Sequence, residues 1–65
     1  MIETTRLNGA KIYVNPHLIE SMEEIPDTRL NFITGKVLLV GESTDVIMKK
    51  IIDYRKKLGI NSQET

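Results

Sequence analysis

The sequence has no cysteine and only one histidine among its 65 residues. Without cysteine the chain can form neither a disulfide nor a thiolate metal site. His17 cannot build a zinc site alone and no carboxylates surround it at ligand spacing, so we expect neither a metal nor another cofactor. No apolar run approaches the roughly 20 residues that span a bilayer, and Met1 leads into a strand-like segment rather than a signal peptide. These absences favour a cytoplasmic protein.

The sequence also lacks an excess of charge of either sign. Nine basic and nine acidic residues give a formal net charge of zero. This balance argues against a general polyanion binder, although charge can still be uneven locally. A chain of this length makes one small domain, whose single core supplies only about 3–5 kcal/mol of stability. We therefore expect a protein that is not an enzyme and that relies on partners.

The clearest pattern that is present is helical and runs from Ser43 to Leu58. Ser43 or Thr44 can cap the free N–H groups at its start, and Gly59 suits the left-handed residue that follows a helix. The large apolar side chains recur at spacings of four, three and four residues, which places them on one face of a helix: Ile47, Ile51, Tyr54 and Leu58. The sequence predicts a C-terminal α-helix here.

A β-hairpin is predicted at the N-terminus. Two segments with strand character, Ile2–Leu7 and Lys11–Val14, flank Asn8-Gly9, the dipeptide typical of a type I′ turn. A two-residue turn would place three pairs of residues opposite one another: Leu7 and Ala10, Thr5 and Ile12, and Glu3 and Val14.

A second hairpin precedes the helix. Residues 29–34 alternate in polarity, Gly35-Lys36 turns the chain, and Val37–Val40 returns as an apolar strand. The inner face, which we expect to lie under the helix, combines Leu30 and Phe32 with one of two pairs: Leu38 and Val40, or Val37 and Leu39.

The stretch between the hairpins, residues 15–25, fits two structures. Asn15 can cap a helix that Pro16 begins, and apolar residues then recur every three positions, which favours a ten-residue helix. In the alternative, Pro16–Leu18 is one tight turn and a strand begins at Ile19, with a bulge that resets its alternation. The local pattern leaves both open.

Several short motifs follow one another from about residue 2 to residue 57. They are Leu7-Asn8-Gly9, Asn15-Pro16, Leu18-Ile19-Glu20, Pro26-Asp27-Thr28, Thr34-Gly35-Lys36, Glu42-Ser43, Ile51-Ile52 and Tyr54-Arg55. This series resembles the flagellar FlbD-like (SwrD) family of swarming-motility proteins in order and spacing. The resemblance implies a short cytoplasmic bacterial protein that supports flagellar motor output and swarming. It favours a strand for Ile19 to Glu24, whereas Gly41 departs from the family pattern and predicts a loose joint before the helix.

The predicted fold is α+β. Five short antiparallel strands form one curved sheet, or half-barrel, which is closed by the C-terminal helix. Residues 1–59 make this single domain and residues 60–65 a polar tail. The predicted function is that of a non-enzymatic interaction protein whose partner is a flagellar motor or assembly component.

An alternative function is that of a small nucleic-acid-binding regulator. The order of elements from Val14-Asn15 to Ile47 resembles the outline of a LytTR-type DNA-binding domain, and residues 49–57 of the helix are rich in basic side chains. However, the basic loops that such a domain would use on phosphates are missing, and no aromatic platform lies beside the basic residues. Nucleic acid is therefore the less favoured partner.

Two charged surfaces are candidate partner contacts. One is an acidic edge made of Glu20, Glu23, Glu24 and Asp27. The other is a basic row on the helix made of Lys49, Lys50, Arg55 and Lys56. Each could dock an oppositely charged protein surface. Each could equally be solvated charge that protects an edge strand or complements the helix dipole. No residue is predicted to be catalytic.

Self-association is predicted from a second apolar row on the helix. Met48 and Ile52 lie about 100° around the helix from Ile47 and Ile51, and one small sheet cannot cover both rows. Each large side chain left in water forfeits on the order of 1.5–3 kcal/mol. We therefore expect a homo-oligomer, most simply a homodimer, that contacts its copy through Met48 and Ile52.

Overall fold

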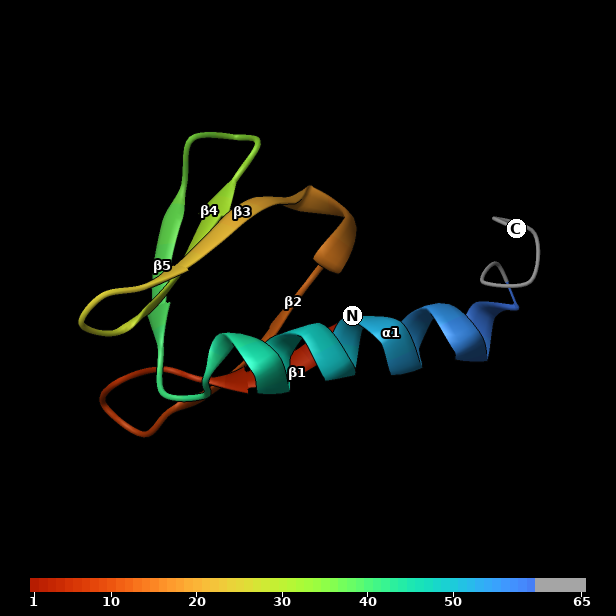
Figure 1. Cartoon of the computed structure of the whole chain (residues 1–65), viewed down its shortest axis with the longest axis horizontal. Helices are drawn as coiled ribbons and strands as arrows, with labels where there is room; N and C mark the ends of the chain where they lie inside the picture. The colour runs from red at the N-terminus through yellow and green to blue at the C-terminus, as the bar shows by residue number, and fades with distance from the viewer. Residues whose placement is uncertain (60–65) are drawn as a thin grey trace.

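The structure is a computed structural model that describes residues 1–59. Five strands and one helix follow in the order β1 (Ile2–Thr5), β2 (Lys11–Val14), β3 (Ile19–Glu24), β4 (Thr28–Phe32), β5 (Val37–Val40) and α1 (Thr44–Leu58) (Figure 1). One turn of 3₁₀ helix, Pro16–Leu18, lies between β2 and β3. The predicted polar tail, residues 60–65, lies outside the described residues.

The N-terminal hairpin forms, but its predicted register is wrong. Ile2 lies opposite Val14, where a two-residue turn would have placed Glu3. The backbone N–H of Arg6 donates to the carbonyl of Ala10 at 2.8 Å, so three residues rather than two form the loop. Only one of these loop residues, a glycine, has a positive φ, whereas a type I′ turn needs two. The observed register pairs apolar residues on the core side, which is what fixes strand register in general.

Residues 15–25 contain one 3₁₀ turn followed by a strand. The Asn15 side chain accepts a hydrogen bond from the backbone N–H of His17 at 3.0 Å, and Pro16 occupies the start of the turn. β3 begins at Ile19, and its pairing with β4 shifts between Ile19 and Ser21, which marks a β-bulge. The strand favoured by the family resemblance is therefore confirmed. Pairing with β4 gives this segment long-range hydrogen bonds, whereas an isolated helix of ten residues is marginal in water.

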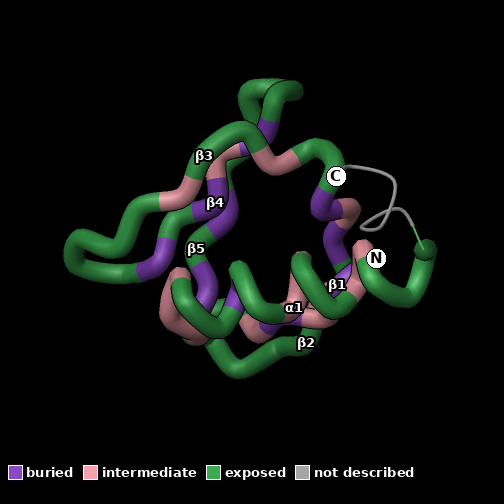
Figure 2. The backbone as a smooth tube through the Cα atoms, turned by 45° about the vertical axis from the view of Figure 1, so that its right-hand side comes forward, coloured by how far each residue is buried: buried purple, intermediate pink, exposed green. Residues whose placement is uncertain are grey.

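β3, β4 and β5 form an antiparallel sheet with β4 in the centre. Leu30 lies opposite Leu38, and both point inward with Phe32 and Val40. The first of the two predicted inner faces is thus correct. The buried apolar residues form one cluster, which draws on both sheets and on α1: Ile2, Val14, Leu30, Phe32, Leu38, Val40 and Ile47. Figure 2 shows these buried segments on the strands and on α1.

The prediction of one five-stranded curved sheet, or half-barrel, is wrong, because the two hairpins belong to separate sheets. One sheet contains β1 and β2, and the other contains β3, β4 and β5. They meet at a single bridge between Arg6 and Val40, beside a 2.8 Å hydrogen bond from the Gly41 N–H to the Thr5 carbonyl. The ladder cannot continue in either direction, because residues 7–9 form the hairpin loop and the residues after Gly41 turn into α1. The hydrogen bond of Gly41 also ties down the joint that the sequence predicted to be loose.

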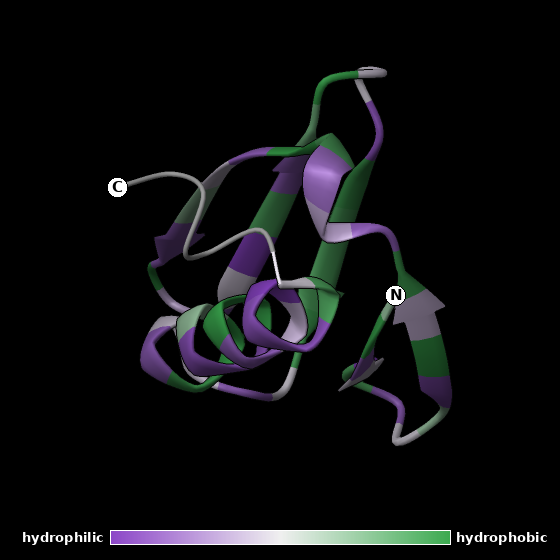
Figure 3. Ribbon diagram, turned by 90° about the vertical axis from the view of Figure 1, so that its right-hand side faces the viewer, coloured by the Kyte–Doolittle hydropathy of each residue, from purple (hydrophilic) through white to green (hydrophobic). Residues whose placement is uncertain are grey.

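α1 begins and ends as its sequence predicts. The Ser43 hydroxyl oxygen accepts a hydrogen bond from the Val46 N–H, and Gly59 adopts the left-handed conformation with φ 74°. Ile47 is fully buried beneath the helix. Figure 3 views α1 nearly along its axis and shows both sheets beside it.

Candidate functional site

The face of the three-stranded sheet that is turned away from α1 exposes large apolar side chains. Val37 and Leu39 on β5 are 45% and 43% exposed, and Ile25 in the turn between β3 and β4 is 92% exposed. These three side chains line a shallow hollow of about 280 Å³ together with Pro26, Asp27 and Arg29. Contiguous exposed apolar surface commonly marks a contact site. We call the surface formed by Ile25, Val37 and Leu39 the outer apolar face.

Charged side chains of β3 and β4 border the outer apolar face. Arg29 lies between Leu39 on one side and Glu23 on the other in the strand register. Glu23 accepts a hydrogen bond at 3.0 Å from an asparagine side chain of β4. Asp27 lines the hollow itself, and Glu20 is exposed at the bulge of β3. Part of the predicted acidic edge is thus the charged rim of an apolar surface.

Glu24, the remaining predicted acidic residue, contacts α1 instead. Its Oε1 accepts hydrogen bonds from the backbone N–H and from the hydroxyl of Thr44, each at 2.8 Å. First the amide bond and then the hydroxyl bond hold the pKa of Glu24 below its ordinary value of 4.5. The carboxylate also lies at the positive end of the helix dipole. Glu24 therefore positions the start of α1 relative to β3.

A polar joint connects β1 to the start of α1. Glu42 Oε1 accepts hydrogen bonds from the Thr4 hydroxyl at 2.6 Å and from the Thr5 N–H at 3.0 Å. Thr4 is fully buried. The carboxylate takes the place that a strand carbonyl would have occupied had the ladder between β1 and β5 continued. Burial alone raises the pKa of Glu42, but the bonds from Thr4 and Thr5 outweigh burial and lower this pKa to about 2.

The residues of the predicted basic row lie in different surroundings: Lys50 belongs to the polar joint, whereas Lys49 and Lys56 face the solvent. Lys50 Nζ donates to the backbone carbonyl of Glu3 at 2.7 Å and lies 3.7 Å from Glu42 Oε2. Lys49 and Lys56 are exposed. Lys50 therefore serves the fold, and the row is not one continuous basic surface.

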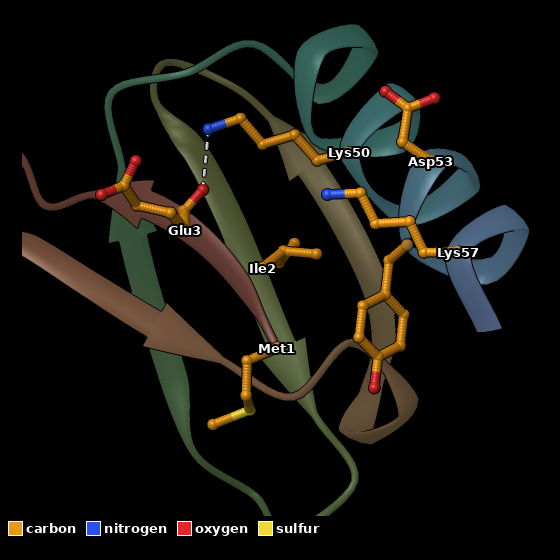
Figure 4. A pocket seen from close by; sticks show the side chains of 7 residues that line it. Met1, Ile2, Glu3, Lys50, Asp53 and Lys57 are labelled. Atoms are coloured by element: carbon orange, nitrogen blue, oxygen red, sulfur yellow. Dashed lines mark hydrogen bonds between the residues drawn. The ribbon is translucent and has the colours of Figure 1, made fainter.

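A second hollow, of about 310 Å³, lies between the start of β1 and α1. In Figure 4, Lys50 reaches the backbone of β1 and the amine of Lys57 points into the hollow, whereas Asp53 points away from it. Tyr54 also lines the hollow and makes an edge contact with His17, with 5.7 Å between ring centres. One amine therefore faces the hollow, and we assign no ligand to it.

The residues predicted for self-association lie exposed on α1. Met48 is 47% and Ile52 is 42% exposed, whereas the adjacent Ile47 is completely buried. Arg55, one turn further along, is half-buried and has an interaction partner within the molecule. Whether a second copy covers Met48 and Ile52 stays a prediction.

Two further observations concern metal binding and membrane spanning in residues 1–59. In that range, no three His, Cys, Asp or Glu side chains are grouped so that they could hold a metal ion. None of the helices described there has the length and apolar character needed to cross a membrane.

The outer apolar face and the polar joint were not predicted from the sequence. The unbroken apolar run Val37–Val40 was the available signal for the first, since a strand with one solvated face needs only alternate apolar residues. The polar joint left no comparable signal, because Glu42 lies 37 residues from Thr5 and 38 from Thr4 in the chain.

The fold defines a small α+β protein built from two antiparallel sheets and one helix. The chain belongs to the FlbD family of flagellar and swarming motility proteins, whose model matches residues 1–59. The family resemblance inferred from the short motifs is thereby confirmed. The comparisons with curated proteins and with solved structures found no match.

Proposed function

We propose that this protein is a non-enzymatic interaction protein of the cytoplasm that supports flagellar motor output and swarming. In this proposal it binds a motor or assembly component through its outer apolar face. Family membership supports the flagellar context. The observation that carries the binding role is the exposure of Val37 and Leu39 on a strand whose other face lies in the core.

The surface also indicates the chemistry of the partner. Covering the exposed parts of Ile25, Val37 and Leu39 would contribute on the order of 1 kcal/mol for each side chain. The rim adds the carboxylates of Glu23 and Asp27. An apolar centre with a charged rim is the usual anatomy of a protein interface. It suits a partner segment whose apolar side chains are flanked by basic groups opposite Glu23 and Asp27 and by an acidic group opposite Arg29.

The two side chains whose pKa values are lowered have structural roles, and this argues against catalysis. Perturbed pKa values often mark active sites, but structural networks perturb them as well. Glu24 and Glu42, whose pKa values are both lowered, are hydrogen-bonded to threonines within the fold. These carboxylates are therefore assigned to holding α1 in place.

A complementation experiment tests the binding face. A strain in which the gene is deleted is supplied with the Leu39→Asp variant, and swarm expansion and the torque of tethered cells are measured. We expect motility to fall to the level of the deletion strain, because a carboxylate at the centre of the contact opposes its burial. The matched control is Val46→Asp, since Val46 is 44% exposed but lies on α1. This control should restore motility.

Different results would contradict the proposed binding site and the proposed function. Circular dichroism must show that both variants melt at the temperature of the unmodified protein, as expected for changes at exposed positions. Full motility with folded Leu39→Asp would contradict the outer apolar face as the binding site. Unchanged swarming and torque after deletion of the gene would contradict the proposed function itself.

A gel shift separates this proposal from the nucleic-acid-binding alternative. Contacts between the basic residues 49–57 and phosphates would give binding that weakens steeply with salt. We expect no shifted band even at about 50 mM salt. A band that the double variant Lys49→Glu, Lys56→Glu abolishes would favour the regulator instead.

A further inference from the structure

Four residues on α1 form a seam beside its buried face: Asp45, Met48, Ile52 and Arg55. Their spacings of three, four and three residues keep side chains on the line along which one helix contacts another. The first three are exposed and the fourth is half-buried. The seam is thus apolar in its middle, acidic at its start and basic at its end.

This seam is complementary to itself in one orientation only. When two α1 helices pack antiparallel about a two-fold axis at mid-helix, Met48 lies opposite Ile52 of the second copy. Asp45 then lies opposite the basic end of the second copy's seam, where Arg55 already has a partner within its own molecule and the adjacent Lys56 is exposed. Parallel packing would instead place like charges together at both ends of the seam. The antiparallel arrangement also aligns the two helix dipoles favourably.

We propose that this α1 seam is the contact surface of a homodimer in which the two helices pack antiparallel. The seam extends over about 15 Å of helix, so the interface is small. We expect reversible association with a dissociation constant on the order of 10–100 µM. The proposal does not rest on the binding role suggested above. The outer apolar face is turned away from α1, so a dimer would leave two copies of it exposed, and a repetitive partner could then be bound with increased avidity.

Sedimentation equilibrium of the full chain tests the proposal through the average mass at increasing concentration. The mass should rise from 7.4 kDa toward twice that value. Ile52→Glu should raise the dissociation constant at least about tenfold, because the new carboxylate must be buried against methionine. Val46→Glu is the matched control, since Val46 is exposed to a similar extent on another side of the same helix. This control should dimerise normally.

A charge swap tests the orientation. Asp45→Arg should weaken the dimer by roughly threefold to tenfold, because each dimer contains the contact between this carboxylate and the basic end of the other seam twice. The double variant Asp45→Arg, Lys56→Asp should recover dimerisation in an antiparallel pair but not in a parallel one. Circular dichroism confirms that each variant is folded.

Three results would overturn the proposal. The first is a monomer mass for the unmodified chain up to about 1 mM, far above the dissociation constants typical of specific interfaces. The second is normal dimerisation of Ile52→Glu, which would place the contact elsewhere. The third is a folded double swap that dimerises no better than Asp45→Arg alone, which would exclude the antiparallel arrangement.

Discussion

The two sheets hold α1 by different kinds of contact. In the three-stranded sheet, Leu30 and Val40 lie in the same cluster as Ile47, and all three are at most 1% exposed. The two-stranded sheet adds apolar side chains to this cluster, but it is also tied to the start of α1 through Glu42 and to the middle of α1 through Lys50. The three-stranded sheet thus relies mainly on apolar burial and adds only the exposed bonds between Thr44 and Glu24, whereas the polar bonds of the two-stranded sheet are partly buried.

This difference determines how each contact responds to a change in the protein or in the solvent. Apolar burial depends on the area removed from water and does not depend on pH. The polar joint depends on an ionised carboxylate, and it fails if that carboxylate is protonated or removed. Because the whole domain has only about 3–5 kcal/mol of stability, each contact is a large fraction of the total.

The largest loss of stability is expected from Leu30→Ala in the apolar contact between α1 and the three-stranded sheet. Truncating a fully buried leucine costs about 2–5 kcal/mol, which is comparable with the total stability, so the variant should be largely unfolded at 25 °C. Circular dichroism and urea titration measure this. Leu39→Ala is the matched control, because the same change on the exposed face of the sheet should cost little. Equal losses for the two variants would refute the assignment of faces.

The second-largest loss of stability is expected from Glu42→Ala in the polar joint. It leaves the buried Thr4 hydroxyl and the Thr5 N–H without their acceptor, which costs about 1–3 kcal/mol. Urea titration gives the free energy of unfolding directly. Glu20→Ala, at an exposed position of β3, should leave that free energy nearly unchanged. An equally small loss for Glu42→Ala would show that the joint contributes nothing.

Acid should weaken the polar joint before the apolar contact. The pKa of Glu42 is about 2 in the folded protein and 4.5 ordinarily. The folded state therefore binds fewer protons, so this contribution is present above pH 4.5 and is lost as the pH falls toward 2. It amounts to about 2–3 kcal/mol. Unfolding free energies measured between pH 6 and pH 2 should show a much smaller decline for Glu42→Gln than for the unmodified protein. Parallel declines would contradict the lowered pKa.

The smallest effect is expected from Glu24→Gln, the polar contact of the three-stranded sheet. The amide oxygen of glutamine can still accept from Thr44, and the site is exposed, so only screened charge is lost. The decrease in melting temperature should be smaller than that for Glu42→Gln. A larger decrease would show that the polar contact of the three-stranded sheet contributes more stability than the polar joint.

Much of the local structure could be predicted from neighbouring residues. Ser43 and Gly59 delimit α1 because capping chemistry acts within one helical turn. The alternation of residues 29–34 predicted a strand with Leu30 and Phe32 inward. For residues 15–25 the local rules alone favoured a ten-residue helix, and the family resemblance pointed to the strand that the structure has.

The candidate site was predicted only in part. Glu23 and Asp27 belong to the rim of the outer apolar face, but Glu24 and Lys50 turned out to bind within the fold. A charge pattern along the chain does not show which carboxylate meets a helix terminus. That depends on where β3 ends relative to α1.

The sequence by itself determined the order of the elements, the bounds of α1 and the family, because each depends on residues close together in the chain or on a series of turn motifs. Only the tertiary structure decided that the two hairpins stay in separate sheets. β1 and β5 meet just where one enters its hairpin loop and the other turns toward α1, so one bridge forms between Arg6 and Val40. The Glu42 carboxylate then accepts the hydrogen bond that a further strand pair would have made. Such pairing depends on where distant segments come together, and no local pattern encodes that.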